Sequence, residues 1–158
     1  MEALLPALTI LAALGAGLVA GIFFAFSTFI MAALGRLPAE GGAAAMQSIN
    51  VTVLNPLFFF VFFGTAGLAL VLAIAALSNW SQPGATYLLA GALLYLIGTI
   101  FVTIACNVPL NNRLASVKPG SAEGASTWAH YLSFWTTWNH VRTAASLAAA
   151  ASFIMALP

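Results

Sequence analysis

Long apolar stretches with few interruptions dominate the pattern of this chain. Residues 4–34, 56–77 and 85–107 are apolar nearly throughout, and a more polar stretch covers residues 136–157. Each is at least as long as the roughly 20 residues that a helix needs to cross a hydrocarbon layer about 30 Å thick. The pattern therefore predicts four transmembrane helices, the first long enough to tilt or to project beyond the bilayer.

The segments between these stretches carry helix signals of their own. Residues 43–53 fit a short interfacial helix, and Asn55-Pro56 predicts the start of the second span, because proline suits a first helical turn. Ser121 is a candidate N-cap for a helix that reaches Trp135 and either stays separate or continues into the fourth span. We therefore predict an all-α membrane protein with one domain, residues 1–158: a four-transmembrane-helix bundle with short interfacial helices in the first and third connectors.

Composition and charge support lipid as the solvent of this chain. Of its 158 residues, 63% are hydrophobic and 4% are charged, against about 25% charged in a soluble domain. No basic run occurs, so nothing predicts a nucleic-acid partner. Cys106 is the single cysteine, which excludes an intrachain disulfide, and we expect it to pack as a small buried side chain. The start of the chain lacks the Lys or Arg of a signal peptide, and its apolar stretch is too long for one, so it fits a retained first span better.

The few basic residues predict an orientation. Arg36 lies in the first connector and Arg113 and Lys118 in the third, whereas the short second connector has no charge. By the positive-inside rule both long connectors face the cytoplasm and both termini face outward. The predicted location is thus a cell membrane, crossed several times.

Polar side chains gather where the predicted spans meet the two long connectors. Because both connectors lie on one side in this topology, these side chains fall at one end of the bundle and can form a polar pocket there. They are Ser27, Thr28, Asn50, Asn55, Asn107, Asn111, Asn112, Arg113, Trp138, Asn139, His140 and Arg142.

Helical spacing sharpens this cluster. Trp128, Trp135, Asn139 and Arg142 recur at steps of seven, four and three and so share one stripe, which Tyr131 and Trp138 flank. An aromatic wall that carries an amide and a guanidinium suits a flat, partly polar organic molecule, whose oxyanion the arginine can hold. The competing interpretation is structural: the arginine snorkels to headgroups, the tryptophans form a membrane-interface belt, and Asn107 and Asn111 cap a helix loosened by Pro109.

His140 is the candidate general base, because only histidine titrates near neutrality without perturbation. No metal site is predicted. His130 and His140 are ten residues apart, and no HxxxH, ExxH or CxxC pattern occurs. The sequence leaves haem ligation by one histidine open and offers nothing in its favour.

Four segments carry a family resemblance: residues 17–27 (GLVAGIFFAFS), Ile49-Asn50 with Asn55-Pro56, residues 107–111 (NVPLN) and residues 135–142 (WTTWNHVR). Through them the chain resembles, over nearly its whole length, the anthrone-oxygenase-like family of small four-span membrane proteins. The last two segments are the most specific.

The resemblance implies oxidation of an anthrone to an anthraquinone by molecular oxygen, without metal, flavin or other cofactor, because a deprotonated anthrone is electron-rich enough to reduce oxygen. On this reading His140 is the base and Arg142 holds the oxyanion. The remaining expected substrate-binding residues are Asn55, Asn107, Asn111, Trp135, Trp138 and Asn139.

The residues leave two other functions open beside a cofactor-independent monooxygenase acting on a hydrophobic aromatic substrate. One is a non-enzymatic membrane subunit or small-molecule-binding protein. The other, less well supported, is a transporter, because inverted repeats and buried acids are missing from the sequence. The expected partners are the lipid bilayer and a small hydrophobic aromatic molecule, and the small-residue face at Gly17 and Gly21 leaves a homo-oligomer open.

Overall fold

The computed structural model describes residues 4–158, and these are helical apart from short turns, with no strand among them. In chain order the elements are α1 (Leu4–Ala25), η1 (Phe26–Ile30), α2 (Met31–Gly35), α3 (Ala39–Thr52), α4 (Pro56–Ser78), α5 (Ala85–Leu93), η2 (Leu94–Phe101), η3 (Thr103–Asn107), α6 (Val108–Ala115) and α7 (Ala122–Met155). The η elements are π-helical. The all-α class predicted from the sequence is confirmed at this level.

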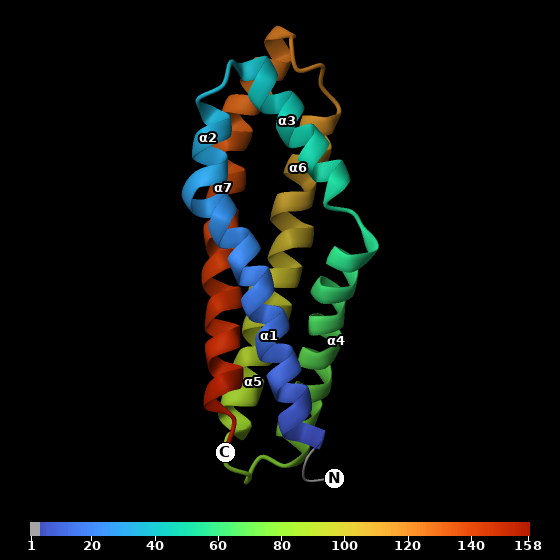
Figure 1. Cartoon of the computed structure of the whole chain (residues 1–158), viewed down its shortest axis with the longest axis vertical. Coiled ribbons are helices and arrows are strands. Elements are labelled where there is room, and N and C mark those ends of the chain that lie inside the picture. The colour runs from blue at the N-terminus through green and yellow to red at the C-terminus, as the bar shows by residue number, and fades with distance from the viewer. Residues whose placement is uncertain (1–3) are drawn as a thin grey trace.

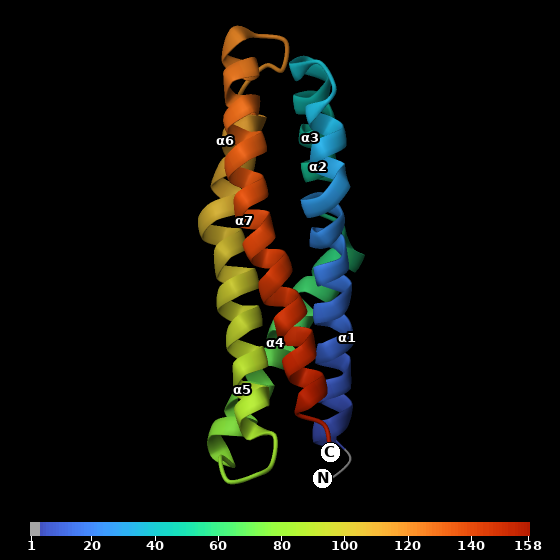
Figure 2. The same ribbon diagram turned by 90° about the vertical axis from the view of Figure 1, so that its left-hand side faces the viewer.

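The long elements stand side by side. Elements α1, η1 and α2 form one continuous rod, and α5, η2, η3 and α6 form another (Figure 1). In Figure 2, α7 lies beside α6 at one end and beside α1 at the other. The chain end and the α4–α5 turn meet at one end of the molecule, whereas α3 lies at the opposite end (Figure 1).

Three helical rods are long and apolar enough to cross a membrane. They are Leu4–Gly35, Pro56–Ser78 and Ala85–Ala115, and they cover the first three stretches that the sequence predicts as spans. These rods indicate a membrane protein. Helix α7 does not reach the same apolar level, because Asn139, His140 and Arg142 lie in the part expected to cross.

Two helix starts form as the sequence predicts. Asn55 accepts a hydrogen bond from the Phe58 amide at 3.0 Å, and Ser121 accepts one from the Gly124 amide at 2.9 Å. A helix also forms in the first connector, α3 over Ala39–Thr52, where the sequence predicts one over residues 43–53; its interfacial position stays a prediction. The separate helix expected in the third connector is wrong: α7 runs for 34 residues from Ala122 without a break, because nothing between Trp135 and Asn139 interrupts helical hydrogen bonding.

Small residues bring some rods close together, although not at the predicted glycine pair. A Cβ on Gly17 or Gly21 would meet nothing within 4 Å, so this face is not used inside the chain. A Cβ on Gly98, in η2, would overlap the Cβ of Ala145 on α7. Gly84 has a φ of +84° and begins α5 against the Ala156 carbonyl, a conformation and a contact that favour glycine.

Buried side chains form two cores, one at each end of the rods. The first surrounds Ala16, Leu72, Tyr95 and Phe153, towards the termini. The second lies under α3 and consists of Met31, Ala43, Met46, Leu114, Trp128, Tyr131 and Trp135. The polar side chains described next lie between these cores.

Candidate functional site

Arg142 is a buried cation with aromatic rings on two sides. Its side chain is 5% exposed. Its guanidinium carbon lies 4.1 Å from the ring centre of Phe23 and 5.0 Å from that of Trp135. Such cation–π contacts offset part of the cost of removing the charge from water.

The hydrogen bonds of Arg142 fix the position of its guanidinium but do not use all of its N–H donors. Nη2 donates to Oδ1 of Asn139 at 2.7 Å, and Nη1 donates to the Thr103 hydroxyl at 3.3 Å. Nε has no partner among the described residues. Neutral groups therefore hold the guanidinium on one side, and two of its five N–H groups donate within the described residues.

No carboxylate in the described part of the chain balances this charge. The acids there are Glu40, in the first turn of α3, and Glu123, in the first turn of α7, and both are exposed. Glu123 precedes Arg142 by 19 positions, about 28 Å along a helix with a rise of 1.5 Å per residue. A buried, unpaired cation of this kind favours an anionic ligand.

Asn139 orients Arg142. Its side chain is fully buried, and Nδ2 donates to the Phe23 carbonyl and to the Ser27 hydroxyl, both at 2.8 Å. These two acceptors fix the amide so that Oδ1 faces the guanidinium. Ser27 in turn bonds Thr143 at 2.9 Å. The network thus joins α7 to the junction of α1 and η1.

A cavity of about 190 Å³ adjoins Arg142. Elements α1, η1, α3, α4, η3, α6 and α7 all contribute to its wall, which is mostly apolar and in part aromatic. The aromatic lining consists of Phe23, Phe26, Phe58, Phe59, Phe62, Phe63 and Trp135. Its polar lining consists of Arg142, Thr103, Asn50 and Asn111.

Asn50 and Asn111 are linked through a buried tyrosine. The Tyr131 hydroxyl donates to Oδ1 of Asn111 at 2.7 Å and accepts from Nδ2 of Asn50 at 3.4 Å. Burial raises the pKa of Tyr131 above its usual value, so the hydroxyl stays neutral and remains a donor. The tyrosine ring stacks between Trp128 and Trp135, with ring centres 5.8 and 5.6 Å apart. The cavity therefore has a second polar part, held by neutral groups.

Of the predicted site residues, the structure brings Arg142, Trp135 and Asn111 to the cavity wall and places Asn139 directly behind Arg142. Asn107 is buried and donates to the Trp135 carbonyl at 3.2 Å, with Oδ1 unpartnered among the described residues, and it does not line the cavity. Its placement fits a role in holding α7.

His140, Trp138 and Asn55 lie elsewhere. All three are exposed and none lines the cavity. His140 and Arg142 are two residues apart on one helix, which turns their side chains about 200° from each other at 3.6 residues per turn. Asn55 is engaged as the N-cap of α4. The structure therefore separates the predicted base from the predicted oxyanion ligand.

The predicted site residues omit most of the aromatic wall and Thr103. Phe58 and Phe62 are four apart on α4, and their rings stack at 5.3 Å, a spacing visible in the sequence. Thr103 opens η3, and Ser27 lies in η1. Single π-helical turns often occur at functional sites, but their positions carried no signal in the sequence pattern.

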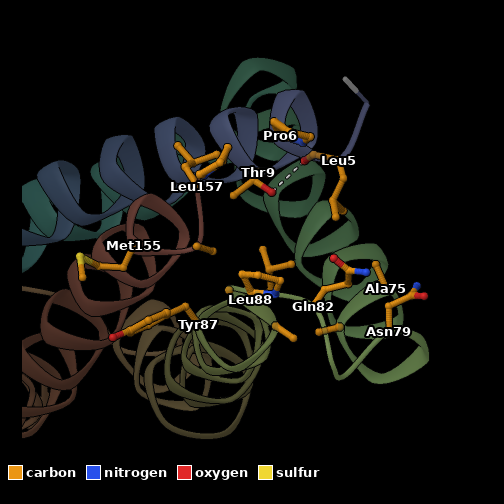
Figure 3. Close-up of a pocket in the computed structure, with 16 residues that line it drawn as sticks. Leu5, Pro6, Thr9, Ala75, Asn79, Gln82, Tyr87, Leu88, Met155 and Leu157 are labelled. Atoms are coloured by element: carbon orange, nitrogen blue, oxygen red, sulfur yellow. Dashed lines mark hydrogen bonds between the residues drawn. The ribbon is translucent and has the colours of Figure 1, made fainter. Parts of the chain in front are cut away.

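A larger cavity lies at the other end of the molecule. It measures about 900 Å³ and is lined by the first turns of α1, the α4–α5 turn and the chain end (Figure 3). Its polar side chains include Thr9, Asn79 and Gln82, and Thr9 is already bonded to the Leu5 carbonyl at 2.8 Å. No Arg, Lys, His or acidic side chain is among the described residues that line it. This cavity is larger, but no described side chain that lines it carries a charge or can act as a general base near neutral pH. The candidate site is therefore the cavity beside Arg142.

The fold and the site together define a class: a helical membrane protein with an aromatic cavity and a buried cation suited to an anionic, flat ligand. The model of the anthrone oxygenase family matches residues 58–152. The chain belongs to this family. No curated protein and no solved structure matches it.

Proposed function

We propose that this chain is a cofactor-independent oxygenase that oxidises a hydrophobic, anthrone-like substrate in the cavity beside Arg142. The observation that carries the proposal is the burial of Arg142, without a carboxylate partner in the described residues, in an aromatic wall. Membership of the anthrone oxygenase family supports the type of reaction.

The proposed reaction converts an anthrone and one O₂ into an anthraquinone and one water. Loss of a methylene proton to water gives an anion whose charge is largely on oxygen, where Arg142 binds it and so favours ionisation. The anion reduces O₂, and a C–O bond forms at the former methylene carbon to give a peroxide. Loss of the second proton from this carbon and cleavage of the O–O bond complete the quinone and release water.

His140 is not the base in this proposal, because its exposed side chain lies outside the cavity. The reaction instead depends on Arg142, which lowers the pKa of the bound substrate so that water can accept the proton. Asn139 contributes by orienting Arg142, and Thr103 accepts a second hydrogen bond from the same guanidinium.

We also propose that α7 is a fourth span, which completes a four-helix transmembrane bundle. Arg142 and Asn139 face the other rods instead of lipid, so the polar residues of α7 are compatible with a membrane. The long connectors would face the cytoplasm and the termini the other side, as the positions of Arg36, Arg113 and Lys118 suggest.

The test measures oxygen uptake and anthraquinone formation with purified protein in lipid nanodiscs. We expect equal molar consumption of anthrone and O₂, a large loss of rate in Arg142→Met, and little change in His140→Ala. Loss of activity in His140→Ala with retention in Arg142→Met would overturn the assignment of roles.

One observation favours a second function, binding without chemistry. Of the described residues that line the cavity, none is a histidine, cysteine, aspartate or glutamate, so no lining side chain titrates near neutrality. If wild-type protein bound anthrones in a manner that needed Arg142 but did not accelerate their oxidation, the chain would be a small-molecule-binding protein.

A further inference from the structure

The wall of the cavity beside Arg142 is open along one apolar edge. Five lining side chains are also exposed on the outside of the molecule, and all five are apolar. They are Leu54 (61% exposed), Phe59 (39%), Phe63 (51%), Ile104 (59%) and Val108 (39%). We call these five residues the mouth.

The mouth lies between two rods. Leu54 precedes α4, and Phe59 and Phe63 occupy its first two turns. Ile104 belongs to η3 and Val108 begins α6. Apart from Leu54, these residues lie in two of the three segments that are long and apolar enough to cross a membrane. A mouth at this position would open to lipid.

The polar groups of the cavity are set back from this edge. Arg142 is buried, and Thr103, Asn50 and Asn111 are partly buried, whereas every residue of the mouth is exposed. A ligand that passes through the mouth would therefore cross apolar surface first and reach the cation last.

The aromatic rings of α4 provide a continuous path between the two regions. Phe59 and Phe63 stack on the outside, with ring centres 5.7 Å apart, and Phe58 and Phe62 stack further in. Phe62 and Phe63 meet edge to face at 5.2 Å and join the two pairs. Such surfaces suit a planar arene, which gains contact area at each stage.

We propose that the substrate enters the cavity laterally from the bilayer, between α4 and the η3–α6 segment, and not from water. This proposal rests on the proposed function for the identity of the ligand. It assigns to the five residues of the mouth a role in access, distinct from the role of Arg142 in binding.

Tryptophan substitution at the mouth tests this route. Ile104→Trp and Val108→Trp would narrow the opening. The matched control is Ile97→Trp, because Ile97 is 56% exposed on the same rod and does not line the cavity. Binding of a fluorescent hydroxyanthracene to the protein in nanodiscs would be followed by stopped-flow fluorescence. Thermal unfolding would confirm that all variants are folded.

A residue that controls access changes association and dissociation equally. We expect both rates to fall by about fivefold or more in Ile104→Trp, with the equilibrium Kd nearly unchanged, and both to stay at wild-type values in Ile97→Trp. At constant total ligand, added lipid dilutes the ligand within the bilayer. The association rate should follow this concentration in the lipid and therefore fall as lipid is added. Unchanged rates in both mouth variants, or a dependence on aqueous ligand alone, would overturn the lateral route.

The two proposals fail differently. If Arg142→Met abolished equilibrium binding while both mouth variants bound at wild-type rates, the site would stand and the lateral route would be wrong. If wild-type protein bound no hydroxyanthracene at all, both proposals would be wrong.

Discussion

The two side chains that bond Arg142, Asn139 and Thr103, each have further hydrogen-bond partners of their own. The Asn139 amide uses Nδ2 on the Phe23 carbonyl and on Ser27, so only Oδ1 faces the guanidinium. Asn139 is therefore a positioning residue instead of a direct substrate ligand. An uncharged partner orients the cation without neutralising it, which leaves its charge available to a ligand.

Replacing Asn139 by aspartate should turn this neutral support into an ion pair. The carboxylate would stay beside Arg142 and compete with an anionic ligand, so affinity for ionised 2-hydroxyanthraquinone should fall at least about tenfold. The ionised and neutral forms of this ligand differ in visible absorbance, which gives both affinity and ionised fraction. Asn139→Ala is the control, with a smaller loss, because it frees Arg142 without adding charge. Equal effects of the two substitutions would contradict the electrostatic role.

Tyr131 allows a test of the second polar part of the cavity. Tyr131→Phe keeps the ring stack with Trp128 and Trp135 but removes the bonds to Asn50 and Asn111, at a cost of about 1 kcal/mol in the free energy of unfolding.

The pH dependence of stability provides a specific signature of this tyrosine. Burial raises the pKa of Tyr131 in the folded state, so the folded protein keeps a proton that the unfolded chain loses above about pH 10. Folding stability should therefore fall as pH rises through and above this value, and less steeply in Tyr131→Phe. Denaturant unfolding of both proteins at pH 8 and above pH 10 measures the difference. Identical slopes would show that Tyr131 is not protected by burial.

At the scale of elements, close approach of α7 to its neighbours sets the geometry of the site. Gly98 in η2 packs against Ala145, one helical turn beyond Arg142. Gly98→Ala should push η2 and α7 apart and lower the unfolding temperature by several degrees, since overpacking costs about 1–3 kcal/mol. Gly17→Ala is the control: its Cβ meets nothing within 4 Å, so better helix propensity should leave stability equal or higher. Unfolding in nanodiscs or detergent compares the two. A larger loss in Gly17→Ala would refute the packing argument.

The sequence predicted the elements well because apolar length and cap residues act locally. Ser121 and Asn55 begin helices where expected, and the stripe of Trp128, Trp135, Asn139 and Arg142 lies on the buried face of α7. The sequence also predicted Arg142, Trp135 and Asn111 as site residues, and the structure brings these three to one cavity.

The pairing of His140 with Arg142 failed for a geometric reason. Closeness along a helix does not place two side chains on one face, and a separation of two residues nearly reverses their direction. The position of Phe58 and Phe62 in the cavity wall could not be predicted either, because it depends on which face of α4 meets α1, α5 and η2. The π-helical turns arise from packing of the assembled rods and leave no local pattern.

At the scale of the whole molecule, the C-terminal end of the chain and the basic residues of the two long connectors lie at opposite ends. The chain end and the α4–α5 turn lie together, because Gly84 contacts the Ala156 carbonyl. Arg36 follows α2, Arg113 lies in the last turn of α6, and Lys118 lies between α6 and α7. The ends of α2 and α6 and the start of α7 are at the end of the molecule where α3 lies (Figure 1). This asymmetric distribution of basic residues favours one orientation of the protein in the membrane.

The position of the C-terminus decides whether α7 crosses the membrane. If it does, glycosylation tags after Pro158 and in the turn at Ser81 should be modified on the same side, and a tag at Lys118-Pro119 should not. Replacing Arg36, Arg113 and Lys118 together by glutamine should produce mixed orientations, because these residues supply the cytoplasmic positive charge. Arg142→Leu is the informative control: Arg142 is buried against other rods, so its loss should leave the orientation unchanged. A C-terminal tag on the side opposite to the Ser81 tag would mean that α7 does not span the bilayer. Arg142 would then lie at the membrane surface, and the cavity it serves would have to be supplied from water.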